Sequence, residues 1–145
     1  MRKDRSDLRH TVALADDHIA VLQRVSTLLA TEFEIVAAVE DGANAVQAGL
    51  DFRPDIFILD ICMPGLSGIQ AAGEMRRLGL SSKLVFLTIQ EDADYLEAAQ
   101  ALGASYVLKS RMHSDLPLAV REALAGRIFV SRLSTPSSLA PVSDR

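Results

Sequence analysis

The chain has 145 residues, 49% of them hydrophobic and 23% charged, a composition typical of one folded domain rather than of a disordered segment. Its formal net charge of -4 argues against the basic surface of a nucleic-acid-binding domain. No apolar run is long enough to cross a bilayer or to form a signal peptide, so we expect a cytoplasmic protein without membrane contact. The single cysteine, Cys62, excludes an internal disulfide, and we expect it to be a small buried apolar residue.

Strand-like and helix-like patterns alternate five times along the chain. Strands are predicted at 11–15, 34–39, 55–59, 83–87 and 106–108. Helices are predicted at about 18–30, from the turn 41–43 to about 52, from the loop 63–68 to about 78, at about 92–102 and at about 114–125. This alternation favours right-handed crossovers and a parallel sheet with helices on both faces. The predicted fold is α/β, a flavodoxin-like doubly wound (βα)5 domain with sheet order 2-1-3-4-5.

The two ends of the chain differ in composition from its middle. Residues 1–10 carry charges but little apolar content, so we expect a flexible N-terminal arm. The folded domain is predicted to span residues 11–127. The Ser- and Pro-rich stretch 134–141 has linker composition, so residues 128–145 are expected to form a linker-like tail.

Four of the five predicted strands end in a charged or hydroxyl-bearing side chain. Asp16 and Asp17 follow the first strand, Asp60 the third, Thr88 the fourth and Lys109 the fifth. Each has an ordinary alternative: the aspartates as caps of the next turn, Thr88 as a plain strand residue, Lys109 as a solvated charge. In a sheet of order 2-1-3-4-5 these strands are neighbours, and ligands collect at their carboxyl ends. Their coincidence therefore favours one shared pocket.

Three carboxylates in one pocket need compensating positive charge. Two like charges about 4 Å apart repel by about 4 kcal/mol at an effective dielectric of about 20, and Lys109 supplies only one counter-charge. Oxygen ligands at a solvent-facing rim favour Mg²⁺. A metal beside a free carboxylate, with a lysine and a hydroxyl opposite, suits phosphoryl transfer to that carboxylate.

These residues resemble those of the receiver domain of two-component response regulators. The resemblance covers roughly residues 10–127, and its other carriers are the segments 59–68 and 103–109. It implies that Asp60 is the phosphoacceptor and that Lys109 contacts the phosphoryl group. It implies a Mg²⁺ site made of Asp16, Asp17, Asp60 and the backbone carbonyl of Cys62. It also implies that Thr88 and Tyr106 form a conformational switch.

The resemblance further implies partners. A sensor histidine kinase would donate the phosphoryl group, so the chain would be a phosphoacceptor that assists its own phosphorylation and dephosphorylation rather than an enzyme. Phosphorylation would change the surface of the fourth helix, fifth strand and fifth helix, with a phosphorylation-dependent homodimer as one candidate outcome. The segments 16–18 and 126–131 resemble the branch whose receivers precede a LuxR-type helix-turn-helix domain. DNA contact would belong to that output domain, which is absent from this chain.

Some residues depart from the family pattern or leave alternatives open. Ser110 stands where many receivers have proline, which leaves the isomer of that peptide bond open, and the bulky Ile89 could narrow access to Asp60.

A hydrolase of the haloacid dehalogenase kind would need an aspartate at Cys62, and nucleotide binding would need a Gly-rich loop after the first strand. A stand-alone or phosphorylation-independent receiver-like interaction module is the remaining alternative. The histidines, His10, His18 and His113, show no metal-ligand spacing and are interpreted as surface residues.

Overall fold

The computed structural model describes residues 9–89 and 91–132. Five strands form one sheet of order β2-β1-β3-β4-β5, which confirms the predicted fold and strand order. The strands are β1 (Thr11–Ala15), β2 (Glu34–Val39), β3 (Ile56–Asp60), β4 (Lys83–Thr88) and β5 (Ser105–Leu108). The helices are α1 (Ile19–Leu29), α2 (Gly42–Phe52), α3 (Gly68–Arg77), α4 (Ala93–Ala101) and α5 (Met112–Leu124), with a 3-10 turn, η1 (Lys109–Arg111), before α5.

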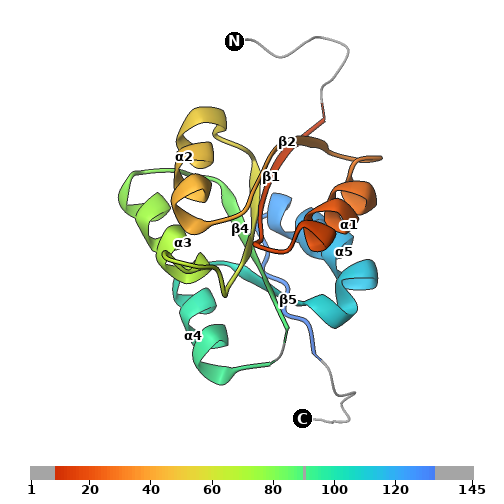
Figure 1. Cartoon of the computed structure of the whole chain (residues 1–145). Coiled ribbons are helices and arrows are strands. Elements are labelled where there is room, and N and C mark those ends of the chain that lie inside the picture. The colour runs from red at the N-terminus through yellow and green to blue at the C-terminus, as the bar shows by residue number, and fades with distance from the viewer. Residues whose placement is uncertain (1–8, 90, 133–145) are drawn as a thin grey trace.

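The helices cover the sheet in two layers. Figure 1 shows α1 and α5 on one face and α2, α3 and α4 on the other. Leu22, Val25 and Leu29 form the buried stripe of α1 that the sequence predicts. On the opposite face, small residues of α2 pack near β3, and a Cβ added at Gly49 would lie only 2.9 Å from Leu80. Each large apolar side chain buried in these two layers contributes about 1.5–3 kcal/mol.

The parallel register places the ends of the strands side by side. The central strand β3 is buried over its whole length. Its last residue, Asp60, lies opposite Leu87, the residue before Thr88. Thr88 in turn lies opposite Leu108, the residue before Lys109. The predicted site residues of β3, β4 and β5 therefore reach the same edge of the sheet.

Helix α5 begins earlier than its sequence predicts. Its N-cap is Arg111 rather than Ser114, and Pro117 lies inside the helix rather than in its first turn. The reason is that η1 turns the chain directly out of β5 at Lys109 and leads into the helix without a separate loop.

The described part of the predicted N-terminal arm contacts the domain. The Arg9 guanidinium donates to the Ala30 carbonyl at 2.8 Å, and the His10 carbonyl accepts from the Glu34 amide at 2.9 Å. Residues 1–8, which make up the rest of that arm, lie outside the described residues.

The chain also remains bonded to the sheet beyond residue 127. The Tyr106 amide donates to the Phe129 carbonyl at 2.9 Å, and the Ser131 amide donates to the Tyr106 carbonyl at 2.8 Å. This corrects the expectation of a linker-like tail from residue 128: backbone groups on the open edge of β5 need partners, and this segment supplies them. Residues 133–145, with the predicted linker composition, lie outside the described residues. Among the helices that the structure describes, none combines the length and apolar character needed to span a bilayer.

Candidate functional site

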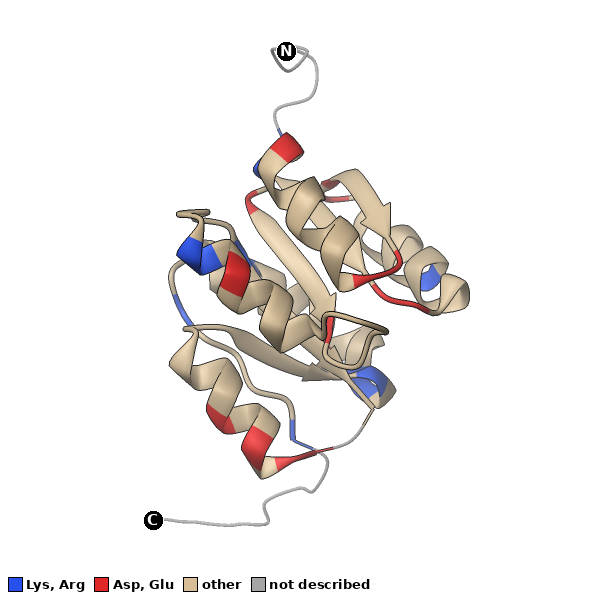
Figure 2. Cartoon of the chain, turned by 60° about the vertical axis from the view of Figure 1, so that its left-hand side comes forward, with Lys and Arg blue, Asp and Glu red and all other residues tan. Residues whose placement is uncertain are grey.

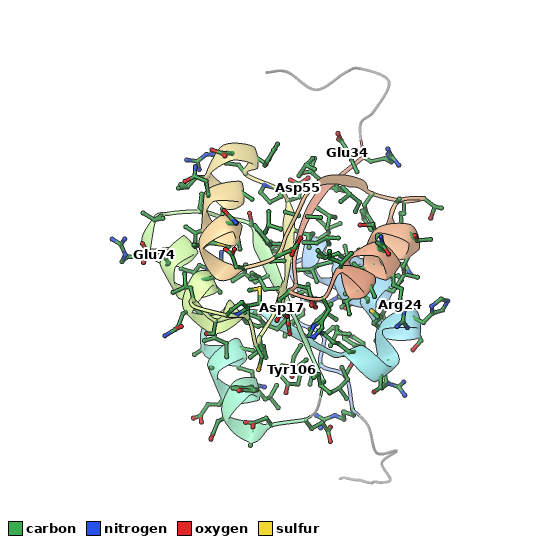
Figure 3. The ribbon with its side chains drawn as sticks, viewed as in Figure 1. Asp17, Arg24, Glu34, Asp55, Glu74 and Tyr106 are labelled. Atoms are coloured by element: carbon green, nitrogen blue, oxygen red, sulfur yellow. The ribbon has the colours of Figure 1, made fainter. Side chains whose placement is uncertain are left out.

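Asp16, Asp60 and Lys109 meet at the carboxyl edge of the sheet. Asp16 is 2% exposed and Asp60 3% exposed. The Lys109 ammonium nitrogen lies 2.8 Å from Asp16 Oδ2 and 3.4 Å from Asp60 Oδ1. Figure 3 shows Asp17 near the middle of the molecule, away from the end of the sheet where Asp55 lies. The structure thus brings together the charged residues that the sequence predicts to share a pocket, here called the acidic pocket (Asp16, Asp17 and Asp60).

The contact between Lys109 and Asp16 leaves Asp16 incompletely bonded. It is an ion pair without hydrogen-bond geometry, so the buried Asp16 Oδ2 has no hydrogen-bond partner among the described residues. The other oxygen, Oδ1, accepts from the His18 amide at 2.9 Å. A buried carboxylate is stable when its lone pairs are satisfied as well as its charge. Asp16 Oδ2 is therefore a candidate cation ligand beside Lys109.

The environment of Asp60 makes its carboxyl group less acidic than usual. Burial is the main cause, and the neighbouring Asp16 charge adds to it, so that the pKa of Asp60 is raised to about 6. Lys109 and the Cys62 amide, 3.4 Å from Asp60 Oδ1, oppose this change. At neutral pH most molecules still carry an ionised Asp60. An ionised carboxylate of perturbed pKa at a strand end is a candidate nucleophile.

The acidic pocket has the donor set of a divalent cation site. Asp16, Asp17, His18 and Asp60 can each present one ligand atom, and these atoms lie within 4.8 Å of one another. Mg²⁺ prefers carboxylate oxygens and keeps several waters, which suits a pocket whose Asp17 side is exposed. The alternative of Asp17 as a helix cap does not hold, because the N-cap of α1 is His18 and no side chain caps it. The residues present thus fit the predicted Mg²⁺.

His18 is the site residue that the sequence interpretation missed. Its Nδ1 lies 3.1 Å from Asp16 Oδ1 and 3.2 Å from Asp17 Oδ1, although 60% of the side chain is exposed. The signal that could have revealed it is its position directly after the acidic pair. His10, in contrast, contacts Asp55 at the opposite end of β3.

Thr88 and Tyr106 are both buried next to the pocket, at 4% and 1% exposure. Burial raises the pKa of Tyr106, and hydrogen bonds from the Asp92 amide and the Thr88 side chain oppose that rise. The Asp92 amide lies 3.2 Å from the Tyr106 hydroxyl. The two predicted switch residues are therefore linked to each other, with the tyrosine ring inside the domain.

Cys62 is exposed, contrary to the expectation of a buried residue. The turn between β3 and α3 carries it outward, and its sulfur lies 3.7 Å from the Tyr95 hydroxyl. This turn is tightly packed, since a Cβ added at Gly68 would lie 2.0 Å from the Asp60 backbone oxygen. A capping box between Ser67 and Gln70 then starts α3. The turn thus holds the backbone after Asp60 close to the acidic pocket.

The structure also describes Ile89 and Ser110, the two residues that depart from the family pattern. Ile89 is 70% exposed at the surface. No cis peptide bond occurs within residues 9–89 and 91–132, so the bond before Ser110 is trans.

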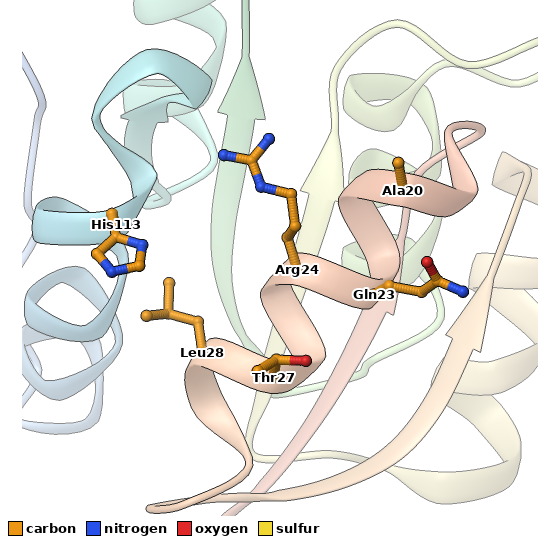
Figure 4. A pocket seen from close by; sticks show the side chains of 6 residues that line it. All are labelled: Ala20, Gln23, Arg24, Thr27, Leu28 and His113. Atoms are coloured by element: carbon orange, nitrogen blue, oxygen red, sulfur yellow. The ribbon is translucent and has the colours of Figure 1, made fainter.

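One surface groove borders the acidic pocket, and another lies apart from it. The groove at the site has a volume of about 580 Å³, and Asp17, Cys62 and Tyr95 are among its lining residues. The other, of about 380 Å³, lies between α1 and α5 (Figure 4) and contains no residue of the acidic pocket; its lining is Ala20, Gln23, Arg24, Thr27, Leu28 and His113. Figure 2 shows that the charged residues on α4 are acidic.

The family model described as "Response regulator receiver domain" matches residues 12–121 of the sequence. The chain belongs to the response regulator receiver domain family. The oxygen regulatory protein NreC of Staphylococcus epidermidis is 36% identical to this receiver domain over 130 residues, which are 87% of this chain and 60% of the relative. The chain therefore spans about 60% of the length of the first curated relatives that it matches.

Solved structures of LuxR-family regulators are similar to this receiver domain, as the sequence resemblance predicts. A two-component response regulator of the LuxR family from Aurantimonas sp. SI85-9A1 has 27% identity and a TM-score of 0.78, with 83% of this chain and 89% of that chain covered. The isolated REC domain of RcsB from Salmonella enterica serovar Typhimurium, in the presence of phosphomimetic BeF3-, has 26% identity and a TM-score of 0.78. That comparison covers 86% of this chain and 94% of the other.

Proposed function

We propose that this receiver domain accepts a phosphoryl group on Asp60 from a sensor histidine kinase in the cytoplasm. The observation that carries the proposal is the cluster at the edge of the sheet, where Lys109 contacts both Asp16 and Asp60 within 3.4 Å. Asp60 is the carboxylate at the end of the central strand, and Asp16 and Asp17 flank it from β1. This placement leaves one oxygen of Asp60 to react while its other oxygen, with Asp16 and Asp17, can contact a cation.

Asp16, Asp17 and Asp60 would hold Mg²⁺, together with the backbone carbonyl of Cys62. When bound, Mg²⁺ supplies positive charge for the phosphoryl oxygens. Lys109 provides the fixed charge of the chain itself and is only 13% exposed, so little solvent screens it.

In the reaction an oxygen of Asp60 attacks the phosphorus atom of the donor. The new O–P bond makes an acyl phosphate, and the bond from phosphorus to the kinase histidine nitrogen breaks, with its electron pair returning to the imidazole. Lys109 stabilises the charge on the transferred oxygens, and preorganised charge of this kind lowers the barrier. The Thr88 hydroxyl donates to one phosphoryl oxygen.

Movement of Thr88 toward the phosphoryl group would alter its hydrogen bond with Tyr106. Because Tyr106 lies in β5 beside α4, this change reaches the surface formed by α4, β5 and α5. A shift of a two-state switch from 1:99 to 99:1 needs about 5.5 kcal/mol of differential interaction. That surface would in turn control a homodimer or a DNA-binding output domain beyond this chain.

The experiment is labelling by a small phosphodonor. Acetyl phosphate and Mg²⁺ should add one phosphoryl group to the wild-type chain, detected by intact-mass spectrometry, and Asp60→Asn should abolish the addition. Asp51→Asn is a matched control, because Asp51 is an exposed aspartate of α2 whose side chain accepts from Gln47. Undiminished labelling of Asp60→Asn would refute the assignment. Light scattering with beryllofluoride tests the homodimer.

A further inference from the structure

Residues 128–131, here called the edge segment, lie along the open edge of β5. The Phe129 amide donates to the Ser105 hydroxyl at 3.0 Å. The Phe129 carbonyl accepts from the Tyr106 amide at 2.9 Å, and the Ser131 amide donates to the Tyr106 carbonyl at 2.8 Å. Val130 is the bridge partner of Tyr106, in a parallel arrangement. The amide and carbonyl of Tyr106 are therefore both bonded to the edge segment.

A second contact fastens the edge segment to α5. The Ser131 hydroxyl donates to Asp115 Oδ2 at 2.5 Å, and both residues are buried, with 2% and 6% exposure. Asp115 also accepts from Arg111 Nε at 3.0 Å and from the Ser114 hydroxyl at 3.1 Å. Hydrogen bonds to a carboxylate are stronger than neutral ones. Ser131 thus ties the edge segment to the first turn of α5, close in the chain to Lys109.

The side chains couple the edge segment to the ring of Tyr106. Tyr106 belongs to the hydrophobic cluster on the α2, α3 and α4 face, and Val130 packs against the same cluster. Phe129 packs against the cluster on the other face, as alternation along an extended segment requires. If the Tyr106 ring left its cluster, Val130 would lose part of the surface on which it packs. The docked edge segment therefore favours the buried position of Tyr106.

We propose that Asp115 and Ser131 are positioning residues for the phosphoacceptor site. They hold the edge segment on β5, stabilise the buried ring of Tyr106, and thereby make docking of residues 128–131 and occupancy of the acidic pocket favour each other. The inference rests on the proposed function, because it takes Tyr106 as the switch that responds to Asp60. Since coupling between two sites is reciprocal, loosening the segment weakens the pocket, and filling the pocket tightens the segment.

The test uses the full 145-residue chain with Mg²⁺ and beryllofluoride as a phosphoryl mimic. Amide hydrogen exchange is followed by NMR at Tyr106 and Ser131, whose amides donate the two backbone-to-backbone hydrogen bonds between β5 and the edge segment. In the wild type, beryllofluoride is expected to slow both amides by about five-fold or more. Ser131→Ala is expected to lose this response and to bind beryllofluoride about five-fold more weakly. Ser114→Ala is the matched control, because it also removes a hydroxyl from Asp115 but leaves the edge segment intact.

The outcomes separate this inference from the proposed function. If acetyl phosphate labels the wild type but beryllofluoride leaves the Ser131 amide unchanged, the inference is overturned and the function stands. If the wild type is not labelled, the function falls, and the inference falls with it. An equal loss of affinity in Ser131→Ala and Ser114→Ala would also overturn the inference, because Asp115 would then only stabilise α5. The wild-type measurement decides the question even if Ser131→Ala does not fold.

Discussion

Asp60→Asn is expected to stabilise the metal-free protein even though it removes the proposed phosphoacceptor. The pKa of Asp60 is raised from 3.8 to about 6, first by burial and then by the charge of Asp16. The folded state therefore disfavours the ionised carboxylate, and a shift of this size corresponds to about 3 kcal/mol. Asparagine has nearly the same shape and no charge. The Asp60→Asn variant loses the contact with Lys109, but the raised pKa of Asp60 already includes the opposing effect of that contact. We therefore expect the free energy of unfolding to increase by about 1–3 kcal/mol at neutral pH.

The pH dependence has a definite sign. Below about pH 3 Asp60 is protonated in both the folded and unfolded states, so the variant and the wild type should be similarly stable. As pH rises through the folded-state pKa of about 6, the wild type loses the stability of its protonated form and the variant does not. Urea unfolding followed by circular dichroism, with a chelator present, measures this difference. Thermal unfolding should show it as about 4 °C per kcal/mol for a domain of this size.

Two further measurements sharpen the comparison. Asp51→Asn, on the exposed surface of α2, should show no such pH-dependent gain. Mg²⁺ should stabilise the wild type more than Asp60→Asn, because a ligand stabilises the state that binds it. The reasoning would be refuted by an Asp60→Asn variant that is less stable than the wild type at neutral pH without metal. A stability difference that stays constant from acid to neutral pH would refute it equally.

Lys109→Ala, which removes the ammonium 3.4 Å from Asp60 Oδ1, is expected to slow labelling by acetyl phosphate about 100-fold, measured as an initial rate with Mg²⁺. Gly68→Ala would place a Cβ 2.0 Å from the Asp60 backbone oxygen and should cost about 1–3 kcal/mol, read from urea unfolding. Gly73→Ala, in the same helix but facing open space, should gain about 0.5–1 kcal/mol. Burial works to raise the pKa of Asp115, but hydrogen bonds from two serines and an arginine hold it below its usual value. The stability from this carboxylate is therefore present above about pH 4 and lost as pH falls further, and Asp115→Asn should flatten that acid limb of the stability curve.

Contrary results are equally specific. An unchanged labelling rate in Lys109→Ala would show that its charge does not act on the phosphoryl group. Equal stability of the Gly68→Ala and Gly73→Ala variants would show that the turn after β3 can relax. If the free energy of unfolding falls equally steeply with decreasing pH in Asp115→Asn and in the wild type, Asp115 does not lose stabilising bonds on protonation.

The strand pattern was predictable because it depends on local sequence. The apolar run before Asp60 reads as a strand buried on both faces, and β3 is buried throughout. Alternation of strands and helices favours right-handed crossovers and a parallel sheet, and the order 2-1-3-4-5 is one of the common orders for such a sheet. Asp16, Asp60 and Lys109 could be placed in one pocket for the same reason: strand ends in a parallel sheet share an edge.

What lies outside regular elements was less predictable. Cys62 is apolar enough to suggest burial, but the tight turn between β3 and α3 carries it outward. The spacing of His18 from the other histidines is not that of metal ligands. Only the turn from β1 into α1 brings its ring within 3.2 Å of both Asp16 and Asp17. Turn geometry depends on close backbone packing, which hydrophobic periodicity does not encode.

The sequence by itself therefore determined the strands, their parallel arrangement and the edge at which Asp60 lies, because periodic burial is a local property and the alternation of strands and helices limits the connections. Only the tertiary structure decided that the chain continues past residue 127 along β5. The short apolar stretch 128–130 gains its place from backbone bonds to Tyr106 and from the buried bond between Ser131 and Asp115. These partners are distant in the sequence, and an open strand edge recruits whichever segment can satisfy its hydrogen bonds.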